Sequence, residues 1–350
     1  MSVGPTRCAR ALIGAAALLA ASLVPAGARD LSLMLRQPGL LAAWQAVFIA
    51  PFTAVTGIRV ASGVWAGGVD MLAQQAKARE TGWDLVMMNG EELAAGCAGG
   101  LLEKLDWSQI GGREHYLPLA VSDCGVGASL ASIVLAWDRD KLAGSATWAD
   151  FWDVTRYPGK RGLHKGVQGN LEIALMADGV APSDVYKVLG TSDGIDRAFR
   201  KLDQLRPYVV WWETPEDASR ILASGDVLMS SAPNAAVGDA ARAARRNFAI
   251  QWTDSLMDVL SWGILKGSPQ IREAMQFLYF SGTPAVQARL SVVADEGGLA
   301  RGASDFVPPE RATLSPTSPA NLQGALRLDV AFWQSNLVKL RQRFEAWLAH

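Results

Sequence analysis

Histidine and the common catalytic motifs are scarce in this sequence. Three histidines occur among 350 residues, and none of them has the HExxH or HxxxH spacing of a zinc site. The chain also has no GxSxG nucleophile turn, no GxxxxGK[ST] phosphate loop and no GxGxxG after an expected strand. We therefore predict a protein that is not an enzyme and that needs no cofactor or metal.

An excess of charge of one sign is also missing. The chain carries 33 Lys and Arg against 34 Asp and Glu, a net charge of -1, without a run of five like charges. Proteins that bind nucleic acid neutralise many phosphates, so we predict no nucleic-acid partner. Apolar residues, by contrast, make up half of the chain, and 350 residues are enough for two sizeable cores.

The longest apolar run lies at the N-terminus. Arg7 and Arg10 precede the apolar residues 11–24, and the small residues 26–28 follow, which is the pattern of a cleaved secretory signal peptide. The alternative, an uncleaved anchor, is too short, because a bilayer core is ~30 Å thick. The pattern predicts a signal peptide over residues 1–28 and a mature protein in the periplasm.

Residues 37–58 form a second stretch without charge. Gln45 and Pro51 interrupt it, and Trp44 and Phe48 recur at helical spacing. We predict a helix that packs on a core rather than a membrane span. The mature chain is therefore expected to be soluble and not to insert into the membrane.

Cysteine is rare, with three in the whole chain, and Cys8 belongs to the predicted signal peptide. Cys97 and Cys124 remain, and two cysteines in an exported protein favour a disulfide bond between them. Two separate buried thiols are the alternative. A CxxC pair is missing, so the sequence does not indicate redox catalysis.

Expected strands and helices alternate along the mature chain, which is typical of a mostly parallel sheet with helices on its faces. The segment Gly125-Val126-Gly127 is interpreted as a loop, and an amphipathic helix from Val330 to Trp347 closes the chain. The sequence thus predicts an α/β fold. The expected strands are 31–35, 58–62, 83–88, 208–213, 227–232, 248–252 and 259–265.

Polar residues follow several of these strands where a helix begins. Asn89, Gly90 and Glu91 follow strand 83–88, Glu213 ends strand 208–213, and Asn234 comes just after strand 227–232. In open α/β sheets, ligands bind beyond the carboxyl ends of the strands. Helix caps without a ligand are the alternative for each position. Their recurrence in both halves predicts a ligand cleft between two halves.

Six segments in order along the mature chain resemble the solute-binding proteins of bacterial ABC importers, specifically the spermidine/putrescine-binding group. The segments are "PFTAVTGIRV" (51–60), "GWDLVMMNGEELAAGCAGGLLEKLDW" (82–107), "TWADFWDVTRYPGKRGL" (147–163), "GNLEIALMADGVAPSDVYKVLG" (169–190), "LRPYVVWWE" (205–213) and "LASGDVLMSSAPNA" (222–235).

This resemblance implies the two-lobed periplasmic-binding-protein fold of type II, in which hinge strands join two α/β lobes. Lobe 1 is expected to hold residues 29–135 and 254–301, and lobe 2 residues 136–253 and 302–350. The lobes are expected to close on a small-molecule solute. The closed protein, a monomer, is then expected to dock on the permease subunits of the transporter.

The resemblance also implies a polyamine as the solute. Glu172 matches an acid that the family uses, and Asp258 and Trp262 stand on the last crossing strand, where an acid and an aromatic ring suit ammonium groups and methylenes. We therefore predict Glu172, Asp258 and Trp262 as ligand-binding residues, together with the residues that follow the strands.

Four positions depart from the polyamine pattern. Leu260 stands where these proteins place an acid, and Arg36, Leu40 and Pro233 stand where they place aromatic rings. An arginine in the cleft repels a polycation, so the alternative is a zwitterionic or carboxylate solute held by Arg36 and helix N-termini. A periplasmic enzyme or accessory binding module is the alternative from another class.

Overall fold

The computed structural model describes residues 29–36, 38–78 and 82–349, together with Met1. The predicted signal peptide lies outside these ranges except for Met1. The strands and helices named below belong to one unit, Leu31–His350, in which they alternate along the chain. The predicted α/β class is therefore confirmed.

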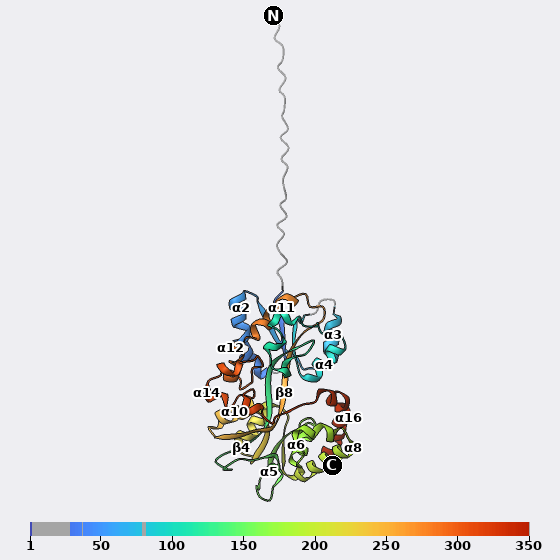
Figure 1. Cartoon of the computed structure of the whole chain (residues 1–350), viewed down its shortest axis with the longest axis vertical. Helices are drawn as coiled ribbons and strands as arrows, with labels where there is room; N and C mark the ends of the chain where they lie inside the picture. The colour runs from blue at the N-terminus through green and yellow to red at the C-terminus, as the bar shows by residue number, and fades with distance from the viewer. Residues whose placement is uncertain (2–28, 37, 79–81, 350) are drawn as a thin grey trace. The chain divides into compact units, whose positions relative to one another are not determined.

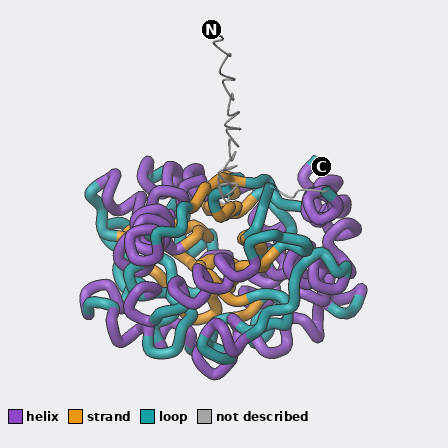
Figure 2. The backbone as a smooth tube through the Cα atoms, turned by 90° about the horizontal axis from the view of Figure 1, so that it is seen from above, coloured by secondary structure: helices purple, strands orange, loops and turns teal. Residues whose placement is uncertain are grey.

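One mixed sheet holds the molecule together, in the order β2-β1-β3-β8-β4-β7-β5-β6, with β9 paired to β8. Figure 2 shows the strands in the interior with helices and loops around them. The strands are β1 (Leu31–Leu35), β2 (Val60–Val64), β3 (Leu85–Met88), β4 (Val126–Asp138), β5 (Arg161–His164), β6 (Val209–Trp212), β7 (Met229–Pro233), β8 (Phe248–Ile264) and β9 (Leu326–Arg327).

Helices cover both faces of this sheet, as expected for strands joined by right-handed crossovers. Those of the first part are α1 (Leu41–Trp44), α2 (Ala50–Thr56), α3 (Val69–Lys77), α4 (Gly90–Ala98), α5 (Trp148–Trp152), α6 (Asn170–Ala177), α7 (Val185–Leu189) and α8 (Ser192–Leu205). The others are α9 (Pro215–Ser224), α10 (Asn234–Ala244), α11 (Ile271–Ser281), α12 (Pro284–Gln287), α13 (Leu290–Val293), α14 (Pro309–Ala312), α15 (Pro319–Leu322) and α16 (Val330–Leu348).

The two long strands β4 and β8 are antiparallel neighbours and organise the whole sheet (Figure 1). β8 has 17 residues, and at ~3.3 Å per residue it extends for about 55 Å. Its carboxyl-terminal end pairs with β3, whereas the carboxyl-terminal end of β4 pairs with β7. The pair of β4 and β8 therefore joins two groups of parallel strands, β1 to β3 and β5 to β7.

The sequence analysis expects two strands where the structure has one, β8, and a loop where β4 begins. The pairing of β4 with β8 shifts between Ile133 and Leu135, where Val134 of β4 faces the four residues 252–255 of β8. Asp254 takes a left-handed conformation there, with φ of 61°. Such an irregularity bends a strand without ending it. The polar break that suggested two strands is thus a bulge within one.

Four clusters of buried apolar residues fill the described part of the chain, and the two largest flank the bulge. The first contains Trp44, Phe52 and Trp262 beside β1, β3 and the end of β8. The second contains Phe151 and Trp333 beside β5, α6 and α8. We call these halves the first and the second lobe. The structure thus has the two-lobed fold with shared hinge strands that the resemblance implies, whereas the predicted lobe boundaries stay a prediction.

The apolar segment Pro38–Thr56, which comprises α1, a π-helical turn and α2, is long and apolar enough to cross a membrane. Its Trp44, Phe48 and Phe52 are nevertheless buried in the core of the first lobe. Phe52 packs edge-on against Phe277 of α11, with ring centroids 5.3 Å apart. These contacts are those of the core helix that the periodicity predicts.

A disulfide bond joins Cys97, near the end of α4, to Cys124, just before β4, with Cα atoms 5.7 Å apart. The predicted pairing is present in the structure. The bond closes a loop of 27 residues in sequence and ties α4 to the strand that carries both lobes.

Replacing both cysteines, Cys97→Ala with Cys124→Ala, is expected to lower the free energy of unfolding by about 3.5 kcal/mol, because the unfolded chain regains the entropy of an open loop. Urea denaturation of the exported wild type and of the double variant, without reductant, measures this difference. Two titratable thiols in the exported wild type, or equal stabilities, contradict the expectation.

Candidate functional site

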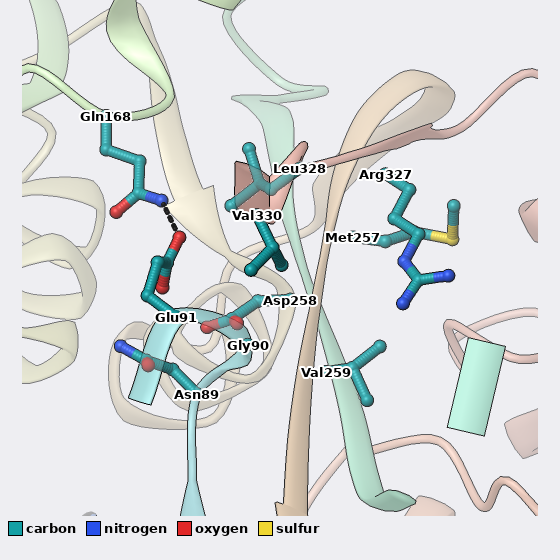
Figure 3. Close-up of a pocket in the computed structure, with 10 residues that line it drawn as sticks. All are labelled: Asn89, Gly90, Glu91, Gln168, Met257, Asp258, Val259, Arg327, Leu328 and Val330. Atoms are coloured by element: carbon teal, nitrogen blue, oxygen red, sulfur yellow. Dashed lines mark hydrogen bonds between the residues drawn. The ribbon is translucent and has the colours of Figure 1, made fainter. Parts of the chain in front are cut away.

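A cavity of about 100 Å³ lies between the lobes, next to the bulge in β8. Its walls come from the start of α4, from the turn before α6, from β8 and from the segment that joins β9 to α16 (Figure 3). The residues that line it are Asn89, Gly90, Glu91, Gln168, Met257, Asp258, Val259, Arg327, Leu328 and Val330.

The first turn of α4 presents Glu91 to this cavity. Asn89 caps the helix and accepts a hydrogen bond from the Glu92 amide at 2.9 Å, while the Glu92 carboxylate accepts from the Asn89 amide at 3.2 Å. This reciprocal cap occupies Glu92 and leaves the side chain of Glu91 to project outward. Glu91 Oε1 then accepts a hydrogen bond of 2.8 Å from Gln168 Nε2 in the second lobe.

Gly90 lets α16 of the second lobe approach α4 of the first. A Cβ atom placed on Gly90 would lie 2.6 Å from Cγ2 of Val330, which is closer than real Cβ contacts allow. Gln334 Nε2 of α16 also donates to the Glu91 carbonyl at 3.3 Å. Together with the Glu91–Gln168 bond, these contacts close one side of the cavity.

Asp258 is the acidic group on the hinge strand. It is half-buried, and its carboxylate has no hydrogen bond among the residues that the structure describes. Burial raises the pKa of Asp258 to about 6; the nearby Glu91 and Glu92 also raise it, and Arg36 opposes them. A desolvated carboxylate among acids is stabilised most by a cation.

Arg36 lies beside these acids but is already engaged. Its Nε donates to Glu92 at 3.1 Å, one of its amino groups donates to the Ala66 carbonyl at 3.0 Å, and the guanidinium stacks 5.5 Å from the Trp65 ring. Arg36 does not line the cavity. It acts as a structural cation that links β1 to α4 and offsets part of the negative charge.

Arg327 on β9 supplies a positive charge to the cavity wall. Figure 3 shows Arg327 on the opposite side of β8 from Glu91 and Asp258. Arg327 is exposed and forms no ion pair within the described part of the chain. The cavity therefore has an acidic side with Glu91 and Asp258 and a basic side with Arg327, where Met257 and Val259 also lie (Figure 3). Leu328 and Val330 complete its apolar lining.

Four of the nine predicted ligand-binding residues, Asn89, Gly90, Glu91 and Asp258, line this cavity. Six lining residues were missed. Gln168 belongs to a glycine-bounded turn, and Arg327 follows a stretch that reads only as a connection. The sequence pattern contained no signal for them beyond that turn. The other missed residues are Met257, Val259, Leu328 and Val330.

Two further predicted residues lie elsewhere in the second lobe. Glu213 is exposed and pairs with Lys165 at 2.7 Å, beside His164. Asn234 is buried at the hinge, where its side chain accepts a hydrogen bond from the Ser132 amide at 2.9 Å and donates to the Asp295 carbonyl. Neither lines the cavity between the lobes.

Trp262 and Leu260 point into the core of the first lobe instead of the cavity. Trp262 is 1% exposed and meets Trp44 edge-on, with ring centroids 5.3 Å apart. Core packing, the commoner use of tryptophan, is the role that the structure gives this residue. Leu260, which stands where polyamine-binding proteins place an acid, is 4% exposed and belongs to this core instead of the cavity wall.

Glu172 is fully buried in the second lobe and does not line the cavity. Its carboxylate accepts hydrogen bonds from the Gly169 amide at 2.9 Å, from the Tyr186 hydroxyl at 2.8 Å and from Trp333 Nε1 at 2.8 Å. Burial raises the pKa of Glu172, while these donors lower it. The residue thus joins the starts of α6 and α16.

The described residues contain no cluster of three His, Cys, Asp or Glu side chains that could hold a metal ion. The groups that face the cavity are two carboxylates, two side-chain amides, one guanidinium and four aliphatic side chains. Such a set can bind a small solute that carries charges of both signs.

Comparison with known proteins places this geometry among transport receptors. The model of the bacterial extracellular solute-binding protein family matches residues 48–300. The gamma-aminobutyric acid-binding protein of Pseudomonas aeruginosa is 40% identical over 309 residues, which is 88% of either chain.

Two solved structures are similar over nearly their whole length. An ABC transporter substrate-binding protein from Bradyrhizobium japonicum is 29% identical with a TM-score of 0.82, and the alignment covers 91% of this chain and 99% of that one. The GABA receptor Atu4243 is 26% identical, also with a TM-score of 0.82, and the alignment covers 91% and 98%.

The buried position of Glu172 leads to a prediction about stability. Glu172→Ala removes a fully buried carboxylate that accepts from three donors, of which Trp333 Nε1 is buried and the others partly buried, so we expect the free energy of unfolding to fall by about 2–4 kcal/mol. Urea denaturation measures the loss, and Glu345→Ala on the exposed face of α16 serves as the matched control. An unchanged midpoint for Glu172→Ala contradicts the structural role.

Proposed function

Because the chain belongs to the bacterial extracellular solute-binding protein family, we propose that it is the receptor of an ABC importer for a small ω-amino acid such as γ-aminobutyrate. The observation that carries the proposal is the cavity with one acidic and one basic end. Proteins of this family bind small solutes and work with permease subunits, which supports the predicted permease partner and a location outside the cytoplasm.

The two ends of the cavity match the two ends of an ω-amino acid. The ammonium group would bind between Glu91 and Asp258, where a charge-assisted hydrogen bond compensates their desolvation. The carboxylate would bind the guanidinium of Arg327, which can bind it with two parallel hydrogen bonds. The methylenes between them would contact the apolar side chains that line the cavity, such as Leu328 and Val330.

The polyamine, the first solute that the sequence resemblance implies, is less well supported than the zwitterionic alternative. A diamine would bring its second ammonium group to Arg327, where like charges repel each other. The relative that is 40% identical is named for γ-aminobutyrate and not for a polyamine. The carboxylate partner in this proposal is Arg327 instead of Arg36, since Glu92 already engages Arg36.

The contacts between the lobes support binding by closure. The Glu91–Gln168 hydrogen bond and the packing of Val330 on Gly90 join α4 to the second lobe beside the cavity. A solute that contacts groups from both lobes stabilises the closed state relative to the open one. Because the family consists of transport proteins, the receptor is favoured over the periplasmic enzyme or accessory binding module.

Isothermal titration of the mature protein with γ-aminobutyrate, butylamine, butyrate and putrescine tests the solute class. We expect γ-aminobutyrate to bind, and each analogue that lacks one of its charges to bind at least tenfold more weakly, a difference of about 1.4 kcal/mol. Asp258→Asn and Arg327→Gln are each expected to weaken binding at least tenfold. Arg272→Gln, on α11 beside Glu273, is the control without effect.

Two outcomes contradict the proposal that the solute is a zwitterion. Putrescine binds as tightly as γ-aminobutyrate, or the Arg327→Gln variant has unchanged affinity for γ-aminobutyrate.

A second titration tests closure through the contact of Gly90 with Val330. Gly90→Ala places a methyl group against Val330, so the lobes cannot close fully and affinity is expected to fall by about fivefold to tenfold. Val330→Ala in the same chain removes the clash and is expected to restore most of the affinity. Equal loss in the single and the double variant would show that closure does not depend on this contact.

A further inference from the structure

A second carboxyl group, that of Glu296, lies near Asp258 on the far edge of β4. The Leu130 amide donates to the Gly297 carbonyl at 3.0 Å and the Gly297 amide to the Leu130 carbonyl at 2.8 Å, which is an antiparallel bridge on the edge of β4. By this register Glu296 stands opposite Ala131. On the other edge of β4, Ala131 pairs with Asp258.

Glu296, Ala131 and Asp258 thus form one row across three neighbouring strands. Residues in such a row lie on the same face of a sheet, and neighbouring strands are ~4.8 Å apart. The two acids are separated by about 10 Å between their backbones, with only the methyl group of Ala131 between their side chains. Both side chains are long enough to extend toward each other over that methyl group.

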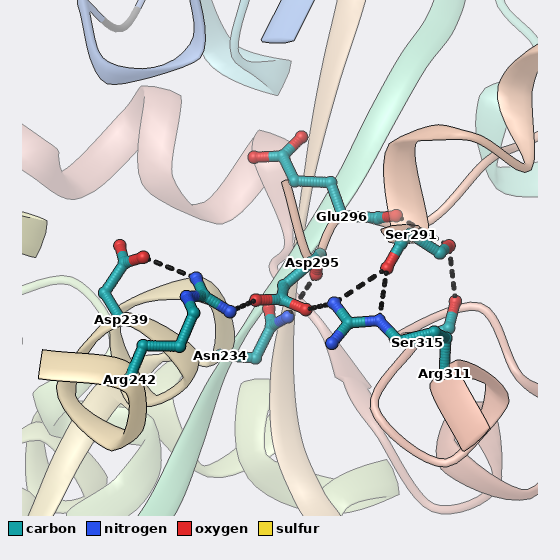
Figure 4. Close-up of polar contacts among 8 residues, drawn as sticks. All are labelled: Asn234, Asp239, Arg242, Ser291, Asp295, Glu296, Arg311 and Ser315. Carbon is teal, nitrogen blue, oxygen red and sulfur yellow. Dashed lines mark hydrogen bonds and ion pairs between the residues drawn. The ribbon is translucent and has the colours of Figure 1, made fainter. Parts of the chain in front are cut away.

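The carboxyl group of Glu296 is buried without a cation. It is 2% exposed, its Oε2 has no hydrogen-bond partner among the described residues, and it forms no ion pair there. The neighbouring Asp295 is different, because Arg242 at 3.1 Å and Arg311 both bind its carboxylate. Figure 4 shows the carboxyl of Glu296 directed away from both arginines.

The groups that face this pair are mostly acidic. Burial raises the pKa of Glu296 to about 7; the Ser129 hydroxyl opposes this, and the charge of Asp258 adds to it. Asp258 in turn faces Glu91 and Glu92 of α4, with Arg36 as the one cation that acts on it within the described residues. An empty cavity therefore leaves a buried carboxyl, Glu296, next to a half-buried one, Asp258, and ionisation of either raises the free energy of ionising the other.

We propose that Glu296 is a positioning residue for the acidic end of the cavity: Glu296 and Asp258 together hold one proton in the empty receptor, and binding of an ammonium group releases it. The inference rests on the proposed function, since it needs an ammonium group at Asp258. The solute keeps its own proton. The carboxyl pair gives its proton to solvent, and a carboxylate–ammonium ion pair forms in its place.

The sign of the pH dependence follows from this exchange. A bound cation stabilises the ionised carboxylates, so their proton affinity is lower in the complex than in the empty receptor. Proton release on binding makes affinity rise with pH. The rise is expected between pH 5.5 and about 7, where the empty pair still holds its proton, and to level off above pH 8.

Isothermal titration with γ-aminobutyrate at pH 6.5, in phosphate and in imidazole buffer, measures the protons released per solute from the difference in binding enthalpy. We expect the wild type to release at least 0.3 proton at pH 6.5 and close to none at pH 8.5, by linkage. Glu296→Gln is expected to bind and to release less than half as much at pH 6.5. Glu114→Gln, an exposed acid, is the control that behaves as the wild type.

Equal proton release from the wild type and Glu296→Gln overturns the inference, and so does binding by the wild type without release at pH 6.5. Proton release by the wild type is measured without a variant, so it tests the inference even if Glu296→Gln does not fold. Binding without release leaves the proposed function in place. Absence of binding by any ammonium-bearing probe overturns both.

Discussion

The pairing of β4 with β8 is the constraint on which the molecule depends, because these strands belong to both lobes at once. Asp258 stands on β8 two residues after Leu256, where the bulge ends, so it lies at the hinge itself. Glu91 and Gln168, by contrast, come from different lobes. In the proposed closure, Glu91 and Gln168 move relative to each other, while Asp258 stays on the strand that both lobes share.

In the proposed binding mode, uncompensated negative charge at this hinge selects for a solute that carries a cation. Asp295 and Glu296 are neighbours in sequence, yet the first has two arginines and the second has none among the described residues. Arg36 is shared with Glu92. Burial of an ionised carboxylate without a partner costs several kcal/mol, and a proton or a bound cation lowers that cost. The proposed cation site would therefore follow from the missing partner of Glu296.

The strand-end rule predicted part of the site because it follows from sheet geometry. Asn89, Gly90 and Glu91 follow a parallel strand next to the hinge strand, so they reach the cleft. Glu213 follows β6, which is the outermost strand of the sheet and lies far from the hinge strands. The rule does not take into account how far a strand lies from the cleft. β4 was missed because Gly127 resembles a loop residue. In the structure it is required by close packing, since a Cβ there would lie 2.5 Å from Leu299 and 2.7 Å from Ala120.

Trp262 was the other misleading residue, because its place on the last crossing strand suggested a contact with the ligand. It is buried in the core of the first lobe, and none of the residues that line the cavity is aromatic. Aliphatic side chains give the methylenes of a solute little directional preference, so discrimination falls to the two charged ends. These ends stand on separate strands, β8 and β9, that are paired at Leu256 and Met257. In the proposed binding mode, a solute that is too short would not reach both charges, and one that is too long would not fit between them. The spacing of the two strands would then select for the chain length of the solute.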